Sequence, residues 1–183
     1  MLLATFVVAI SGVTVTPASA ASVLSASFSG AVVVDGTVYA RHGQTVTLNL
    51  TTDAETKCVK VEGAHTAEDS STTAKTSWAI PLSVESGDGS RAVTVAAFKN
   101  INPQGKCTAN KGESLGTLSA SYVADNTSPV VTGARTPTPN GAGWNKADTT
   151  VTWSATDSGS GVGSGPTPAT DTQTTETAGT THT

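Results

Sequence analysis

The residues that could take part in chemistry are few, and one short pattern among them matches a catalytic motif. Gly-Glu-Ser-Leu-Gly at residues 112–116 fits G-x-S-x-G, in which the serine acts as a nucleophile at a sharp turn between a strand and a helix. The residues that follow, 117–123, instead have the alternating pattern of a strand. We therefore expect no catalysis by Ser114 and interpret the chain as a non-enzyme.

The three histidines, His42, His65 and His182, each lie among turn-forming or polar residues. Such positions favour exposed loop side chains over metal ligands or catalytic bases. A zinc site would also need further Cys or His at short spacing, which this sequence does not offer. We expect neither a bound metal nor a cofactor.

Three side chains with oxygen atoms could coordinate calcium, a hard cation that prefers carboxylates and carbonyls. They are Asp157, which precedes a Ser/Gly-rich stretch, and Asp125 with its neighbour Asn126. No Asp-x-Asp-x-Asp-Gly loop is present. Asp and Asn in turns usually accept hydrogen bonds from nearby backbone N–H groups, and this is the interpretation that we favour.

Two further patterns concern sugars. Trp144, beside Gly143, could stack on a sugar ring, but such a Trp more often closes the end of a sandwich by burying its apolar face, which is our expectation. Asn49 and Asn126 begin the glycosylation sequons Asn-Leu-Thr and Asn-Thr-Ser. A bacterial source would make both sequon matches incidental.

The chain has two cysteines, Cys58 and Cys107, and both precede residue 125. An even number of cysteines in an exported chain indicates a disulfide, because the compartments outside the cytosol are oxidising. Two separate buried thiols are the alternative.

The first twenty residues differ in character from the rest. Residues 2–15 are mostly apolar and uncharged, and Ala18-Ser19-Ala20 gives a small-x-small pattern before Ala21. These features are typical of a signal peptide that is cleaved between Ala20 and Ala21, with a buried N-terminal strand as the alternative. We expect the protein to be secreted or extracellular, either free or attached to the cell surface.

The composition excludes some partners and favours strands. A net charge of −4, with Lys and Arg scattered along the chain, gives no basic patch for nucleic acid or for a charged membrane surface. Thr and Val favour strands, whereas the 18 Gly and 8 Pro interrupt any long helix.

Short strands follow one another from residue 31 onward. Asp-Gly at residues 35–36 predicts a tight hairpin, because this pair accepts the positive φ angles of a type I′ turn. Val46, Leu48 and Leu50 alternate with polar residues and therefore share one face of a strand. A further strand is expected around Trp78, Ile80, Leu82 and Val84, with Pro81 on its other face.

Proline on that strand is tolerable only at a sheet edge or a bulge, because it has no N–H to donate. We also expect strands at residues 58–61, 92–98 and 118–123, a polar loop at 63–76 and a turn at 86–90. About seven strands separated by turns predict a β-sandwich.

A domain boundary is expected at Asp-Asn-Thr-Ser-Pro, residues 125–129, because these residue types disfavour both helix interiors and central strands. The predicted organisation is a signal peptide at 1–20, a β-sandwich at 21–125 and a second module at 126–183. In the second module the strongest strand runs from 150 to 157, with Val151, Trp153 and Ala155 on one face.

The second module resembles the bacterial immunoglobulin-like (Ig-like) repeats of secreted and cell-surface proteins. The resemblance rests on Asp-Asn-Thr-x-Pro at 125–129, Pro-Asn-Gly-x-Gly-Trp-Asn at 139–145, Val-Thr-Trp-Ser-Ala-Thr-Asp at 151–157 and Ser-Gly-Val at 160–162. Residues 177–181 also fit. The family pattern normally continues through a further strand pair, so the resemblance implies that this second module is incomplete.

The resemblance implies an all-β chain of two tandem Ig-like sandwiches, the second truncated at its C-terminus, without catalytic residues. The expected function is that of a non-catalytic structural or adhesion module of a larger bacterial surface or secreted protein. The alternative is a carbohydrate-binding accessory region of a secreted hydrolase. Expected partners are cell-wall or other extracellular polysaccharide, a host or surface protein, and neighbouring Ig-like repeats, but not nucleic acid.

Overall fold

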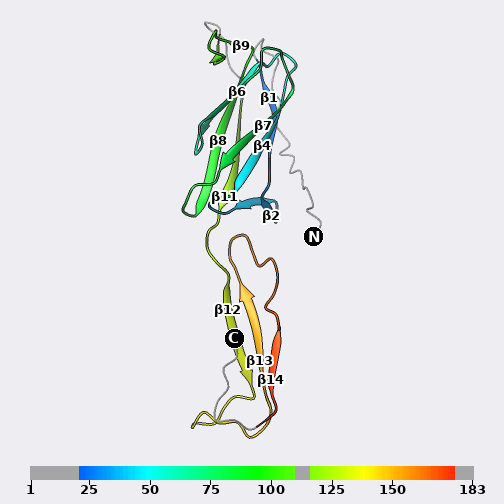
Figure 1. Cartoon of the computed structure of the whole chain (residues 1–183), viewed down its shortest axis with the longest axis vertical. Coiled ribbons are helices and arrows are strands. Elements are labelled where there is room, and N and C mark those ends of the chain that lie inside the picture. The colour runs from blue at the N-terminus through cyan, green and yellow to red at the C-terminus, as the bar shows by residue number, and fades with distance from the viewer. Residues whose placement is uncertain (1–20, 110–115, 176–183) are drawn as a thin grey trace. The chain divides into compact units, whose positions relative to one another are not determined.

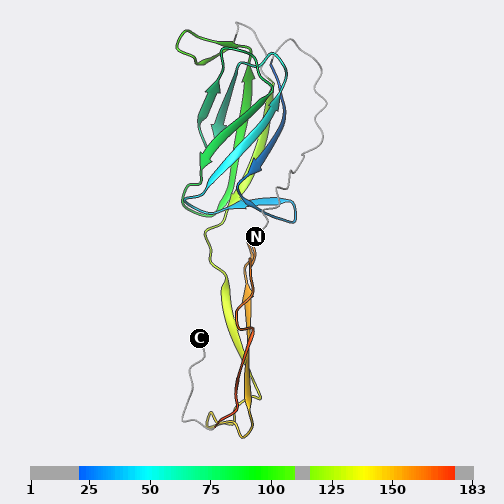
Figure 2. The same cartoon turned by 45° about the vertical axis from the view of Figure 1, so that its right-hand side comes forward.

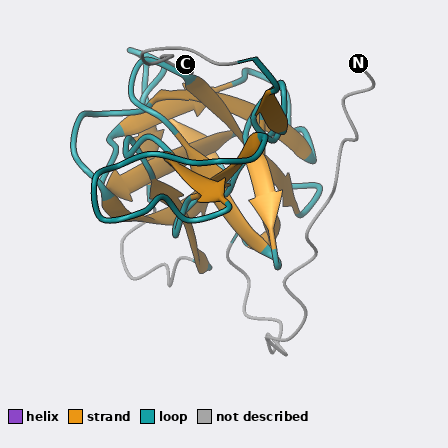
Figure 3. Cartoon of the chain, turned by 90° about the horizontal axis from the view of Figure 1, so that it is seen from below, coloured by secondary structure: helices purple, strands orange, loops and turns teal. Residues whose placement is uncertain are grey.

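Strands and loops make up the residues that the computed structural model describes, 21–109 and 116–175 (Figures 1 and 3). The predicted all-β fold class is confirmed. The signal segment 1–20, including Ala20, lies outside the described residues, as do Ser114, His182 and residues 177–181 of the family pattern.

The chain divides between Asn126 and Thr127 into two compact units. The strands of the first unit are β1 Val23–Ser29, β2 Val32–Val34, β3 Thr37–Ala40, β4 Thr45–Thr52, β5 Cys58–Gly63, β6 Ala67–Ser70, β7 Ser77–Ser83, β8 Gly89–Phe98, β9 Asn100–Ile101, β10 Cys107–Thr108 and β11 Thr117–Ala124. Those of the second unit are β12 Val130–Thr136, β13 Thr149–Thr156 and β14 Thr170–Gln173.

The first unit is a sandwich of two sheets. One sheet has the order β1-β4-β7 and the other β2-β3-β11-β8-β5-β6, while β9 and β10 form a separate ribbon (Figure 2). All neighbours are antiparallel except β3 and β11, which are parallel. This partition matches the Ig fold, in which strands A, B and E lie in one sheet and C, F and G in the other.

Alternating apolar side chains from both sheets form the core. Val46, Leu48 and Leu50 of β4 are all buried, as their spacing predicts. Phe28 of β1 meets Tyr122 of β11 edge to face across the sandwich, with ring centroids 5.3 Å apart. The largest buried side chain, Trp78, donates its indole N–H to the Thr52 hydroxyl over 3.0 Å, so its polar atom is satisfied.

The predicted hairpin and edge strand are both present. β2 pairs with β3, and the turn between them has positive φ at Asp35 (48°) and Gly36 (79°), as a type I′ turn requires. Pro81 lies on β7 at the edge of its sheet, with its side chain on the exposed face. An edge strand tolerates the missing N–H of Pro81 better than a central strand would.

Two strands in the two sheets of the first unit, β1 and β6, were not expected. β1 was missed because a bulge between Val23 and Ser25 breaks its alternation, so that Val23, Ala26 and Phe28 are the buried positions. The predicted polar loop at 63–76 is wrong in part, since residues 67–70 form β6. This edge strand pairs with β5, and Ala67 is its one apolar residue that packs against the core.

The second unit is a three-stranded antiparallel sheet with the order β12-β13-β14. Val151, Trp153 and Ala155 of β13 are half-buried, whereas β12 is exposed along its length. Trp153 lies opposite Gly133 of β12, and a Cβ atom at that position would come within 2.7 Å of the indole ring. Gly133 therefore provides the space that Trp153 occupies across the neighbouring strand.

Truncation of the core side chain Leu48 tests the sandwich. Leu48→Ala removes a fully buried side chain, and we expect the free energy of unfolding of the first unit to fall by about 2–5 kcal/mol. Leu24→Ala, at a position 59% exposed on β1, is the matched control and should change it little. Urea titration followed by Trp fluorescence measures both, and equal effects would contradict the assigned core.

Candidate functional site

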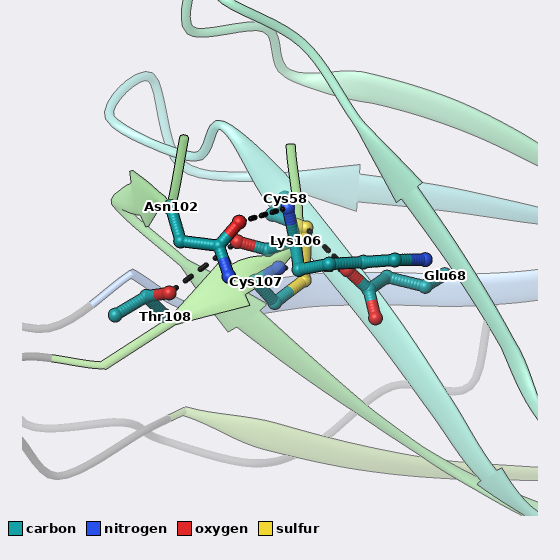
Figure 4. The surroundings of a disulfide bond; sticks show 6 residues. All are labelled: Cys58, Glu68, Asn102, Lys106, Cys107 and Thr108. Carbon is teal, nitrogen blue, oxygen red and sulfur yellow. Dashed lines mark hydrogen bonds between the residues drawn. A yellow bond between two sulfur atoms is a disulfide. The ribbon is translucent and has the colours of Figure 1, made fainter. Parts of the chain in front are cut away.

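The disulfide between Cys58 and Cys107 is the most distinctive chemical feature of the described residues (Figure 4). Cys58 begins β5 inside the core, whereas Cys107 lies on β10, in the ribbon outside the two sheets. The predicted pairing is confirmed. The bond fastens the ribbon to the end of the sandwich where β5 starts.

A carboxylate lies directly beside this bond. Glu68 of β6 accepts a hydrogen bond from the Cys107 backbone N–H, at 2.7 Å, and the same oxygen is 3.8 Å from the Cys58 sulfur. The ligand atoms of Cys58, Glu68 and Cys107 all lie within 4.8 Å of one another. Because metal binding needs thiolates and these sulfurs are bonded to each other, the group is a cross-link rather than a metal centre.

An asparagine turn orients the strand that carries Cys107. Asn102 begins the sequence Asn-Pro-Gln-Gly, a favourable β-turn composition, and Gly105 has a φ of 75°. The side-chain oxygen of Asn102 accepts hydrogen bonds from the N–H groups of Gln104 and Lys106 at 3.0 and 2.9 Å. Sequence reasoning missed this turn and Glu68, although the Asn-Pro-x-Gly signal was available.

Asn126, a candidate calcium ligand, is instead part of a structural network at the other end of β8. Its side-chain oxygen accepts a hydrogen bond from the His42 N–H, its side-chain amide donates to the Gly87 carbonyl at 3.1 Å, and its backbone N–H donates to Asp88 at 2.7 Å. The N–H of Asp125 donates to the Ala40 carbonyl at 2.9 Å. These bonds close the end of the first unit.

Asp157 has the role expected of an aspartate in a turn. One carboxylate oxygen accepts hydrogen bonds from the N–H groups of Gly159 and Gly161, at 2.8 and 3.1 Å. The second oxygen, Oδ2, is buried and has no hydrogen-bond partner among the described residues. The arrangement fixes the start of the loop between β13 and β14.

Of the two histidines within the described residues, one departs from expectation. His42 is exposed, with its Nδ1 3.2 Å from the Val84 carbonyl oxygen. His65, predicted to be an exposed loop side chain, is half-buried with its Nε2 2.7 Å from the hydroxyl oxygen of Tyr122. Burial lowers the pKa of His65 and raises the pKa of Tyr122, so burial favours the neutral form of both groups.

The expectation for Trp144 is wrong. This side chain was predicted to bury its apolar face, but it is 56% exposed on the loop between β12 and β13. The loop is shaped by Asn140, whose side-chain oxygen accepts hydrogen bonds from the N–H groups of Ala142 and Trp144. These local polar contacts hold the backbone of the loop that carries the indole, a feature that the size and apolarity of the side chain did not predict.

Comparisons with known proteins found no family model, no curated protein and no solved structure that matches this chain. Within residues 21–109 and 116–175 there is no helix long and apolar enough to cross a membrane.

Loss of the disulfide should destabilise the first unit strongly. The cross-linked cysteines are 49 residues apart, so Cys58→Ser with Cys107→Ser should lower the free energy of unfolding by about 4 kcal/mol through the entropy of the unfolded chain. Urea titration of the double variant and of the oxidised wild type measures this difference. An unchanged transition would show that the cross-link has no stabilising role.

The His65–Tyr122 pair should make stability depend on pH near neutrality. The folded-state pKa of His65 lies below its unfolded value of 6.5, so the unfolded chain takes up a proton first as the pH falls. The contribution of His65 to the free energy of unfolding is fully present above about pH 7. It is lost as the pH falls below 6.5 toward the folded-state pKa. The melting temperature of wild type should therefore fall across this window, and His65→Gln should show a smaller fall. An identical fall in the variant would contradict this assignment.

Proposed function

We propose that this chain is a non-catalytic, extracellular Ig-like structural or adhesion module of a larger bacterial secreted or surface protein. The observation that carries the proposal is the disulfide-linked Ig-like sandwich followed directly by a second β-sheet unit. Disulfides of this kind persist outside the reducing cytosol, which agrees with the signal-peptide pattern of residues 1–20.

The use of polar side chains supports the same proposal. Asn126, Asp157 and Glu68 all accept hydrogen bonds from backbone N–H groups and thereby hold loops or turns in place. Within each unit these oxygens stabilise the backbone, as expected of a structural module. The proposed partners are neighbouring Ig-like repeats, extracellular polysaccharide, or a protein of a host or cell surface.

Export is the decisive test of the proposed function. The full chain, expressed in the organism that carries the gene, should be recovered from the medium or the cell surface with Ala21 as its first residue and without free thiols. Fractionation, N-terminal sequencing and thiol titration measure these three properties. Recovery from the cytoplasm with an intact leader and reduced cysteines would refute it.

Exposure of Trp144 favours a second candidate, a carbohydrate-binding accessory region. An exposed indole on a loop can stack its apolar face on a sugar ring, and Trp144 is 56% exposed. If this is its role, Trp144→Ala should abolish most of the retention on insoluble cellulose, chitin or peptidoglycan. Leu24→Ala, which removes a similarly exposed apolar side chain from the first unit, is the control. If the wild type binds none of these polymers, a carbohydrate-binding role toward cellulose, chitin and peptidoglycan is excluded.

A further inference from the structure

The second unit presents the same tripeptide twice in its loops. Pro-Thr-Pro occurs at residues 137–139, just after β12, and again at residues 166–168, just before β14. A residue that precedes proline is restricted to β or polyproline II backbone conformations, and proline itself has no N–H for a sheet ladder. The two threonines, Thr138 and Thr167, are therefore kept outside the sheet.

Both loops are anchored close to the threonine. The side-chain amide of Asn145 donates a hydrogen bond to the Pro137 carbonyl at 2.6 Å, and the Trp153 N–H donates to the Ala169 carbonyl at 2.9 Å. Thr138 and Thr167 are both exposed. Each hydroxyl is thus displayed on a segment whose backbone is fixed beside it.

The hydroxyls themselves are free, in contrast to those of several threonines on the strands. Neither Thr138 nor Thr167 makes a hydrogen bond within residues 21–109 and 116–175. On the sheet, Thr132 is bonded to Ser154 at 2.8 Å and Thr150 to Thr172 at 3.2 Å.

The side chains of both sequon asparagines, Asn49 and Asn126, already make hydrogen bonds within the first unit. The side-chain amide of Asn49 donates to the Ser29 hydroxyl at 2.9 Å and that of Asn126 to the Gly87 carbonyl at 3.1 Å. Glycosylation replaces one N–H of the amide, so Asn49, which also donates to the Thr47 carbonyl at 3.2 Å, would lose one of its two hydrogen bonds.

We propose that Thr138 and Thr167 are acceptor sites for O-linked glycosylation. Exposed threonine flanked by proline is the composition of O-glycosylated stalk segments, and the proposal rests on the extracellular function proposed above. The co-substrate is a sugar activated as a phosphate ester. The Oγ of threonine bonds to the anomeric carbon, the carbon–oxygen bond to phosphate breaks with its electrons leaving on the phosphate, and the hydroxyl proton passes to a base of the transferase.

The test is the intact mass of the full chain purified from the organism that carries the gene, with the exported and cytoplasmic fractions measured separately. The exported protein should exceed the mass of its mature polypeptide by a whole number of sugar residues. Electron-transfer fragmentation should place these sugars on Thr138 and Thr167.

Two variants serve as a matched pair. The double variant Thr138→Ala with Thr167→Ala should return the exported protein to the polypeptide mass. The control, Thr132→Ala with Thr150→Ala, removes two hydrogen-bonded hydroxyls from the sheet of the second unit and should leave the sugars in place. Sugars on other residues only, or an exported wild type at the polypeptide mass, would overturn this inference and leave the proposed function standing. A protein found solely in the cytoplasm with its leader intact would overturn both proposals.

Discussion

Burial of large side chains between the two sheets is the interaction on which the first unit depends. Trp78 and Tyr122 contribute the largest buried side chains, and each can be buried only because its polar atom has a partner. Thr52 accepts the indole N–H of Trp78, and His65 lies within hydrogen-bond distance of the Tyr122 hydroxyl. The core is thus stabilised by the burial of apolar area, and the polar atoms buried with it have hydrogen-bond partners.

The sequence allowed the prediction of those parts of the fold that depend on alternation and turn chemistry. The 35–36 turn, the buried face of β4 and the edge position of Pro81 all follow from residue type and spacing. β1 and β6 could not be predicted in this way, because one contains a bulge and the other is a short, mostly polar strand whose partners β5 and Cys107 lie in other segments of the chain.

Some side-chain contacts join segments that are far apart in the sequence, and these contacts could not be predicted from it. His65 is 57 residues from Tyr122, and Glu68 is 39 residues from Cys107. No local pattern marks either pair. Trp144 lies on a loop whose backbone is held by Asn140 and is 56% exposed, so a prediction made from the size of the indole was wrong.

The end of β11 has a mechanical consequence. Asn126 is bonded to His42, Gly87 and Asp88, and β11 is bonded laterally to β8 and, in parallel, to β3. Tension that enters the first unit through Thr127 is therefore passed along the strand axis, so that the lateral bonds share the load at the same time instead of opening one after another. Such a shear geometry resists force better than peeling, because the lateral bonds must break together.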